Sequence, residues 1–348
     1  MLGNNDPNRN KLKTILAAKS HEVIERFRQT AISGITDTDV ISILEAVNTY
    51  WKEVYRPALT AFACEAVGGD ASSANDAGLM ITLAAAGMGI HDDIIDKSEI
   101  SHFRRTILGR YGNDKALLIG DLLIIKGLTT GVALLQKSFP PEKRDAVMMA
   151  LQDFLLEIFE GALMDVTCRR NLDTDLDLYS KIIWKLTADG EACTRIGAIT
   201  GGGTKSEIHA LSEFGRRLGF VHHLSEEVKD AMNEEGALPH RLEFESVPLP
   251  ILYAAKSSRK AFVKIDLNLQ KPLTLPSILE ITKLCWKSKA FGYTYDLAKA
   301  NAVEAVEKLD SLRPSPAVDA LLLMLNVPLT YLKRARNFEN RYTKMLSS

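Results

Sequence analysis

The chain has 348 residues, of which 46% are hydrophobic, and this length and composition are sufficient for a large buried core. Its 43 basic and 44 acidic residues give a formal net charge of −1, so no overall field draws it to nucleic acid or to an anionic membrane, and no nucleic-acid partner is expected. Four cysteines (Cys64, Cys168, Cys193, Cys285) are scattered without metal-ligand spacing, and the polar segment Met1 to Thr14 lacks the apolar stretch of a signal peptide, which together predict a reduced, cytoplasmic chain.

Residues 1–9 are rich in Gly, Asn, Asp and Pro and are expected to be disordered. From residue 10 to residue 348, apolar side chains recur at three- and four-residue spacing, and alternating strand-like runs are missing. This pattern predicts a single all-α domain of about ten helices. The expected breaks between helices contain glycine or proline: Gly68-Gly69-Asp70, Ser138 to Pro141, Gly201-Gly202-Gly203, Gln270-Lys271-Pro272 and Arg313 to Pro316.

The longest apolar runs, around residues 78–90 and 320–325, are too short to span a membrane, so they are interpreted as buried core helices. No transmembrane segment is expected.

The first of these runs ends in an acidic cluster, His91-Asp92-Asp93-Ile94-Ile95-Asp96. At helical spacing Asp92 and Asp96 share a face, so their oxygens can approach one hard cation. Mg²⁺ suits such a site, because it prefers a few carboxylates together with phosphate oxygens and water. A solvated helix end is the alternative interpretation of this cluster alone, and His91 is interpreted as a packed residue because imidazole is a poor Mg²⁺ ligand.

A second acidic cluster, Glu226-Glu227-Val228-Lys229-Asp230, repeats the spacing at the end of the apolar stretch from Phe214 to Leu224. Two such clusters facing each other across a helical bundle can hold one diphosphate through shared metal ions. This pairing favours a metal site over two solvated helix ends.

The chain resembles the polyprenyl synthetase family of trans-isoprenyl diphosphate synthases over roughly residues 40 to 260. Asp92-Asp93-x-x-Asp96 matches the family's first aspartate-rich motif, and Gly219 to Asp230 matches the second with two aspartates replaced by glutamates. Further matches are Arg56-Pro57, Glu65 to Gly69, Gly120 to Leu123, Gly161 to Asp165 and Tyr179 to Ala188.

This resemblance implies a bundle of about ten to thirteen helices around a central cavity, usually in a homodimer. It also implies that both clusters (Asp92, Asp93, Asp96; Glu226, Glu227, Asp230) bind Mg²⁺, three ions in all, and that Asp92, Asp93 and Asp96 serve catalysis. The implied reaction ionises an allylic diphosphate and condenses it with isopentenyl diphosphate to give a longer polyprenyl diphosphate. An apolar cavity would keep water from quenching the allylic cation.

Several basic positions of the family pattern differ in this chain. Glu53 stands at the lysine of the family's G-G-K-R-x-R-P signature, and Ala85 at its usual histidine. The arginine pair after the first motif becomes Ser101-His102, and the lysine before Thr187 becomes Leu186. Basic residues within a few positions of the losses, or retained in the pattern, are expected to bind the diphosphates: Lys52, Arg56, Arg104, Arg105, Lys185 and Arg241.

Three interpretations of these departures remain open: a prenyltransferase with displaced basic residues, a class I terpene synthase that handles one diphosphate, and a non-catalytic subunit of a heteromeric prenyl synthase. By the same resemblance, Ala84, Gly87 and Met88 are expected to set the depth of the chain-length pocket. Small side chains at Ala84 and Gly87 predict that hydrocarbon chains of about twenty carbons or longer fit.

Overall fold

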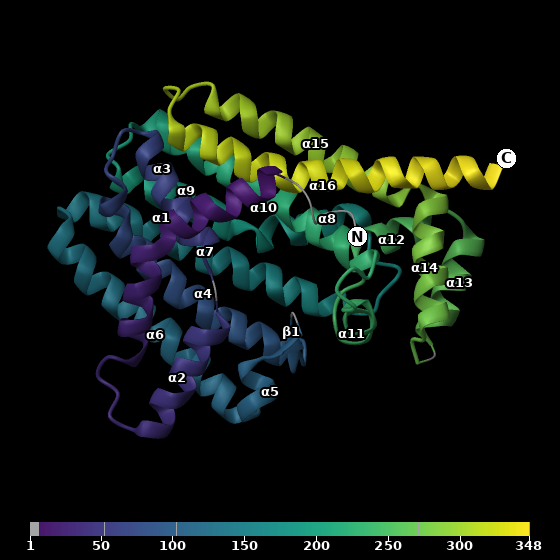
Figure 1. Cartoon of the computed structure of the whole chain (residues 1–348), viewed down its shortest axis with the longest axis horizontal. Helices are drawn as coiled ribbons and strands as arrows, with labels where there is room; N and C mark the ends of the chain where they lie inside the picture. The colour runs from purple at the N-terminus through teal and green to yellow at the C-terminus, as the bar shows by residue number, and fades with distance from the viewer. Residues whose placement is uncertain (1–6, 52, 102, 271, 348) are drawn as a thin grey trace.

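The computed structural model describes residues 7–51, 53–101, 103–270 and 272–347 (Figure 1). Its regular elements are α1 (Pro7–Ile32), α2 (Thr38–Tyr50), α3 (Tyr55–Ala66), the 3₁₀ helix η1 (Ala71–Ala74), α4 (Asn75–Ile95), β1 (Ile100–Ser101), β2 (Arg104–Arg105), α5 (Ile107–Tyr111), α6 (Asn113–Ser138), α7 (Pro141–Thr167), α8 (Leu176–Leu186), α9 (Ala188–Thr200), α10 (Lys205–Ala231), α11 (Leu238–Phe244), α12 (Leu249–Lys256), α13 (Arg259–Leu269), α14 (Leu275–Ser288), α15 (Ala290–Leu309) and α16 (Pro316–Ser347). The predicted all-α class is confirmed.

Helices in the described part of the chain run to α16, which is more than the ten to thirteen expected. The excess comes from short helices, such as the five-residue α5 and the seven-residue α11, which are too short for a periodic pattern to reveal. The five predicted breaks coincide with boundaries between helices, and Lys271 of the fourth break lies outside the described residues. Of the segment 1–9 that was expected to be disordered, residues 1–6 lie outside the described residues. Residues 7–9 are helical, since α1 begins at Pro7 and proline is tolerated in a first helical turn.

Helix α10 lies within the body of the molecule and packs against α9, α15, α16 and α12 (Figure 1). Its buried side chains include Phe214, Leu218 and Val221. A capping box between Thr204 and Glu207 fixes its first turn, because each side chain satisfies a backbone group of the other. The second acidic cluster therefore lies at the C-terminal end of a helix whose first turn is capped and whose apolar face is packed in the core.

Helices α4 and α6 pack unusually closely. A Cβ atom added at Gly87 would overlap the carbonyl oxygen of Gly120, and one added at Gly127 would lie 2.9 Å from the backbone nitrogen of Ala84. Glycine is needed at such contacts because any side chain would separate the two backbones. This packing fixes the direction in which the first acidic cluster emerges from α4.

Two interactions order the region at the C-terminal end of α4. Antiparallel strands β1 and β2 pair Ser101 with Arg104, and His240 of α11 places its Nε2 atom 2.9 Å from the carbonyl oxygen of Asp96. The two acidic clusters, the β1–β2 turn and α11 are thereby brought to the same end of the bundle.

Candidate active site

A cavity of about 800 Å³ opens beside the C-terminal end of α4. Its apolar wall is formed by side chains of α4, α7 and the segment after α2, including Trp51, Met88, Phe154, Ile158 and Phe159. Its polar side contains Glu53, Arg56, His91, Asp92, Asp93, Arg104 and His223. A cavity with one charged side and one long apolar wall suits an amphiphilic ligand with an ionic head and a hydrocarbon tail.

Asp92 and Asp93 line this cavity, and neither carboxylate has a cationic partner within the described residues. Burial, with the neighbouring charge of Asp92, raises the pKa of Asp93 to about 7. Burial also raises the pKa of Asp92, with a contribution from Asp165. Crowded carboxylates of this kind are electrostatically unfavourable unless a cation or a proton compensates them.

Asp96 behaves differently, because the guanidinium of Arg169 binds its carboxylate. Arg169 also donates from Nη1 to the carbonyl oxygen of Ile95 at 2.8 Å, so it closes the C-terminal end of α4 with a positive charge. On the predicted face shared by Asp92 and Asp96, Asp96 is thus occupied by Arg169. Asp92, and Asp93 beside it, are the carboxylates of the first cluster that form no ion pair with a described residue.

The first cluster suits Mg²⁺ by its donor chemistry, because it offers hard carboxylate oxygens with no competing cation on Asp92 and Asp93. In the described residues no three His, Cys, Asp or Glu side chains converge as a ready-made metal-binding group.

The second cluster is already neutralised by the chain itself. The Arg241 guanidinium binds both Glu227 and Asp230, and Lys229 Nζ lies 2.6 Å from Glu226 Oε1. Glu227 is fully buried and accepts further hydrogen bonds from the Leu249 backbone N–H at 2.6 Å and from the Tyr179 hydroxyl at 3.3 Å. Although burial opposes ionisation, Arg241, His223 and the Leu249 backbone N–H lower the pKa of Glu227 to about 2.

Glu227, expected from the sequence to be a metal ligand, is therefore a buried structural ion, because its oxygens face protein donors and not the cavity. The two clusters do lie near one another. His223, one turn before Glu227, lines the same cavity as Asp92, and Arg241 and His223 both lower the pKa of Asp92 against the effect of burial.

The residues expected to bind diphosphate have different surroundings. Arg104 lines the cavity. Arg56 also lines it, but its Nη1 atom lies 2.5 Å from Glu53 and its Nη2 atom 2.8 Å from Asp189. Arg105 faces α5, where it donates to the carbonyl oxygen of Gly109 at 3.3 Å, and Lys52 lies outside the described residues. Of the five that the structure describes, only Arg104 and Arg56 line the cavity, and Arg56 is already paired.

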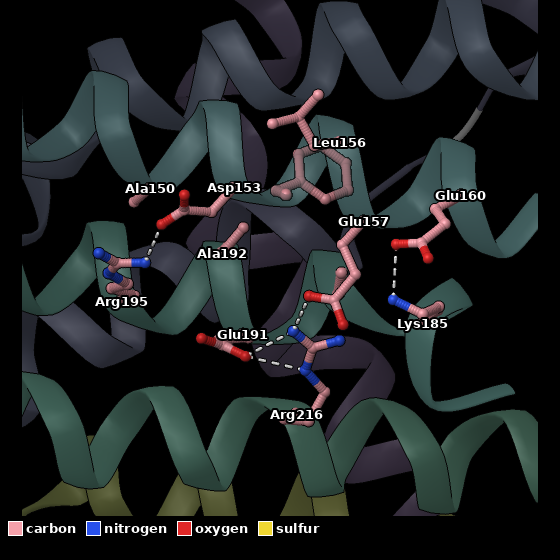
Figure 2. Close-up of a pocket in the computed structure, with 12 residues that line it drawn as sticks. Ala150, Asp153, Leu156, Glu157, Glu160, Lys185, Glu191, Ala192, Arg195 and Arg216 are labelled. Atoms are coloured by element: carbon pink, nitrogen blue, oxygen red, sulfur yellow. Dashed lines mark hydrogen bonds and ion pairs between the residues drawn. The ribbon is translucent and has the colours of Figure 1, made fainter. Parts of the chain in front are cut away.

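Lys185 points into a separate pocket of about 450 Å³ between α7, α9 and α10 (Figure 2). There its Nζ atom lies 2.8 Å from Glu160, while Arg216 bridges Glu157 and Glu191 and Arg195 pairs with Asp153 (Figure 2). Each basic side chain of this pocket is thus matched by a carboxylate. Leu186 lines the same cavity as Asp92, whereas Lys185, one residue earlier in α8, points in a different direction because consecutive helical side chains are rotated by about 100°. The expected role of Lys185 in diphosphate binding is therefore not supported.

The positions expected to set chain length divide in the same way. Met88 lines the cavity, but Ala84 and Gly87 face α6, where they form the close helix contact described above. Ala85, one residue after Ala84, and Gly89, two residues after Gly87, line the cavity instead. The two small residues expected to line the pocket therefore lie on a different face of α4 from the cavity.

Two side chains at the site were not identified from the sequence. Arg169 follows the Gly161 to Asp165 motif, and the signal that could have revealed it is the adjacent basic pair Arg169-Arg170. Trp51 packs its ring over Gly89, since a Cβ atom there would lie 2.7 Å from the ring, and its indole Nε1 has no hydrogen-bond partner. Trp51 stands where the family signature G-G-K-R-x-R-P begins with glycine, and this replacement by a bulky residue was the available signal.

Comparisons with known proteins agree with this arrangement. The sequence profile of the polyprenyl synthetase family matches residues 46–272. A short chain isoprenyl diphosphate synthase of Methanothermobacter thermautotrophicus is 28% identical over 324 residues, which cover 90% of this chain and 97% of the relative. A geranylgeranyl diphosphate synthase of Methanosarcina mazei is 27% identical, with 77% of this chain and 82% of the relative covered.

Solved structures share the fold. A geranylgeranyl pyrophosphate synthetase from Pyrococcus horikoshii superposes with a TM-score of 0.79 at 24% identity, covering 92% of this chain and 98% of its own. A polyprenyl synthase from Caulobacter crescentus, solved with calcium and isoprenyl diphosphate, gives a TM-score of 0.81 at 18% identity, with coverage of 92% and 97%.

Proposed function

Because the chain belongs to the polyprenyl synthetase family and is a prenyltransferase by that membership, we propose that it ionises an allylic diphosphate with Mg²⁺ and condenses it with isopentenyl diphosphate to give a longer polyprenyl diphosphate. The observation that carries this proposal is a pair of carboxylates, Asp92 and Asp93, that form no ion pair within the described part of the chain and lie at the polar side of a cavity with an apolar wall. They are the residues that would hold Mg²⁺.

Bound there, Mg²⁺ supplies Lewis-acid stabilisation of the charge that develops on a departing diphosphate. The residues of the chain contribute the rest. We expect Arg104 of β2 to bind the diphosphate, and the apolar wall of Phe154, Ile158 and Phe159 to exclude water from the hydrocarbon. The ring of Trp51 offers an aromatic face, which stabilises a nearby cation without reacting with it.

A direct test incubates the purified protein with Mg²⁺, allylic diphosphates of several chain lengths and labelled isopentenyl diphosphate. Label should appear in a longer diphosphate, and pyrophosphate should be released in equal amount. A matched reaction with Asp92→Asn controls for contaminating activity. Absence of both label incorporation and pyrophosphate release across all chain lengths would contradict the proposal and favour a non-catalytic subunit.

A second candidate function is supported by one observation: Arg56 is bound by Glu53 and Asp189. A smaller cavity of about 270 Å³ adjoins the first and is lined by Arg56 and three carboxylates, those of Glu53, Asp189 and Glu226. This surplus of negative charge disfavours a second diphosphate, as in an enzyme that ionises one diphosphate without elongating it. Pyrophosphate release accompanied by a hydrocarbon or an alcohol, with no label in a longer diphosphate, is the outcome that distinguishes this function.

We further propose that the protein acts as a cytoplasmic homodimer. Helices α6 and α7 expose large apolar side chains to solvent, among them Leu118 at 65%, Ile125 at 57%, Leu156 at 64% and Leu163 at 70%. By length and composition α6 and the segment 71–95 could each cross a membrane, but the apolar stretch of the latter is 61% buried inside the protein, against 28% for that of α6. A second copy that covers α6 explains its apolar surface. Light scattering should give twice the chain mass. A single chain mass together with flotation of the protein with liposomes would instead favour a membrane partner.

A further inference from the structure

The second acidic cluster contains an internal cation that occupies the position where a metal ion would neutralise it. Arg241 extends from α11 between Glu227 and Asp230 of α10, and its Nη2 atom is also 3.2 Å from the Tyr179 hydroxyl. Its Nε atom faces Glu245 and the carbonyl oxygen of Ser246, at 3.8 and 3.4 Å. Every nitrogen of the guanidinium therefore has a protein acceptor nearby.

The carboxylates have correspondingly little left to offer a metal. Glu227 is fully buried, and both of its oxygens accept hydrogen bonds from the protein. Asp230 shares the guanidinium with Glu227. Glu226 is the most accessible of the three and is paired with Lys229 within its own helix. Each of the three carboxylates expected to ligate a metal ion is thus paired with a protein cation, Glu227 and Asp230 with Arg241 and Glu226 with Lys229.

A fixed guanidinium and a divalent metal ion exclude one another here, because both require the same carboxylate oxygens and repel each other. The two clusters differ in this respect, since Asp92 and Asp93 line the cavity and neither forms an ion pair with a residue that the structure describes. We infer that Arg241 replaces the metal of the second cluster, and that this protein binds divalent ions through the first cluster only.

This inference rests on the proposed function for the identity of the ligand, an organic or inorganic diphosphate, but its test does not require turnover. Mn²⁺ serves as a paramagnetic substitute for Mg²⁺, and inorganic pyrophosphate serves as the probe for the diphosphate. The number of Mn²⁺ ions bound per chain is counted by electron paramagnetic resonance at saturating pyrophosphate.

Glu226→Gln and Asp230→Asn should leave the number of bound Mn²⁺ ions unchanged, whereas Asp92→Asn should lower it. Loss of an ion in Glu226→Gln or Asp230→Asn would overturn the inference. These results are independent of catalysis. If the wild type is inactive but the Mn²⁺ count falls only in the Asp92→Asn variant, the proposed reaction is contradicted and the inference is supported.

Arg241→Ala provides the converse test, because removal of the guanidinium frees Glu227 and Asp230. The variant should bind more Mn²⁺ than the wild type, and added Mn²⁺ should raise its midpoint of thermal unfolding by more than that of the wild type. An unchanged count in a folded Arg241→Ala protein would overturn the inference. If the variant does not fold, the Glu226→Gln and Asp230→Asn counts decide.

Discussion

Arg56 lies between Glu53 and Asp189, with its two terminal nitrogens 2.5 and 2.8 Å from their carboxylates. Glu53 further accepts hydrogen bonds from the backbone N–H groups of Tyr55 and Arg56, so it also caps the start of α3. The one arginine that matches the family signature is therefore held by the residue that stands at the signature's lysine.

Glu53→Gln should release Arg56 toward the cavity, because it removes one of the two opposing charges while its amide oxygen can still cap α3. We expect the KM for isopentenyl diphosphate to fall severalfold, with a smaller change for the allylic substrate. Steady-state kinetics with each substrate varied in turn measure this. Glu25→Gln, which breaks an exposed pair with Arg28 at the same sequence spacing, is the control and should change neither KM. A raised KM for isopentenyl diphosphate in Glu53→Gln would contradict the prediction.

Asp92→Ala should lower kcat by two or more orders of magnitude. It should leave the free energy of unfolding unchanged or slightly higher, because no described residue forms an ion pair with Asp92, and burial together with the charge of Asp165 raises its pKa despite the more distant Arg169, Arg241 and His223. Asp96→Ala should lower kcat and also destabilise the fold by about 1–3 kcal/mol, since Arg169 loses its carboxylate. Chemical denaturation and turnover assays on both variants test the contrast. Equal loss of stability in the two variants would show that Asp92 has a structural partner.

Ala85→Phe should shorten the product, because Ala85 lines the cavity one helical turn before Gly89 and below Asp92. Gly87→Ala is the control. A Cβ atom at Gly87 would strike the backbone of α6, so this variant should lower the midpoint of thermal unfolding while the chain length of the product stays the same. Product lengths are read by mass spectrometry. A shorter product from Gly87→Ala with unchanged stability would place the chain-length wall on the α6 side of α4.

The stability of the metal-free protein should fall as the pH rises through about 7. Burial and the charge of Asp92 raise the pKa of Asp93 from 3.8 to about 7, so the folded state binds a proton on Asp93 more tightly than the unfolded state. That contribution is complete below pH 4 and is lost as Asp93 ionises near neutrality. Mg²⁺ should offset the loss, so the rise in the unfolding midpoint on adding Mg²⁺ should grow between pH 6 and pH 8.5. Thermal scans in EDTA and in Mg²⁺ measure it. Asp93→Asn should flatten both trends, and a Mg²⁺ effect that shrinks with pH would contradict the assignment.

The sequence by itself determined the all-α class, the five main breaks between helices, the two acidic clusters and the family. Each of these depends on local order along the chain. Helical spacing follows from residues three and four apart, a break from glycine or proline, and a motif from neighbours such as Asp92 and Asp93. Local patterns also showed that Glu53 and Ala85 replace basic positions of the family signature.

Only the tertiary structure decided which charges are free. Arg241 and Lys185 both stand near family positions in the sequence, yet one is buried between Glu227 and Asp230 and the other pairs with Glu160 away from the cavity. Whether a side chain faces a ligand or a neighbour depends on a rotation of about 100° per helical residue and on what packs beside that face. Gly87 and Ala85 differ for the same reason. Ion pairs join residues from separate helices, so the sequence lists the charges, while the packing of α4, α10 and α11 determines which remain available for a metal ion and a diphosphate.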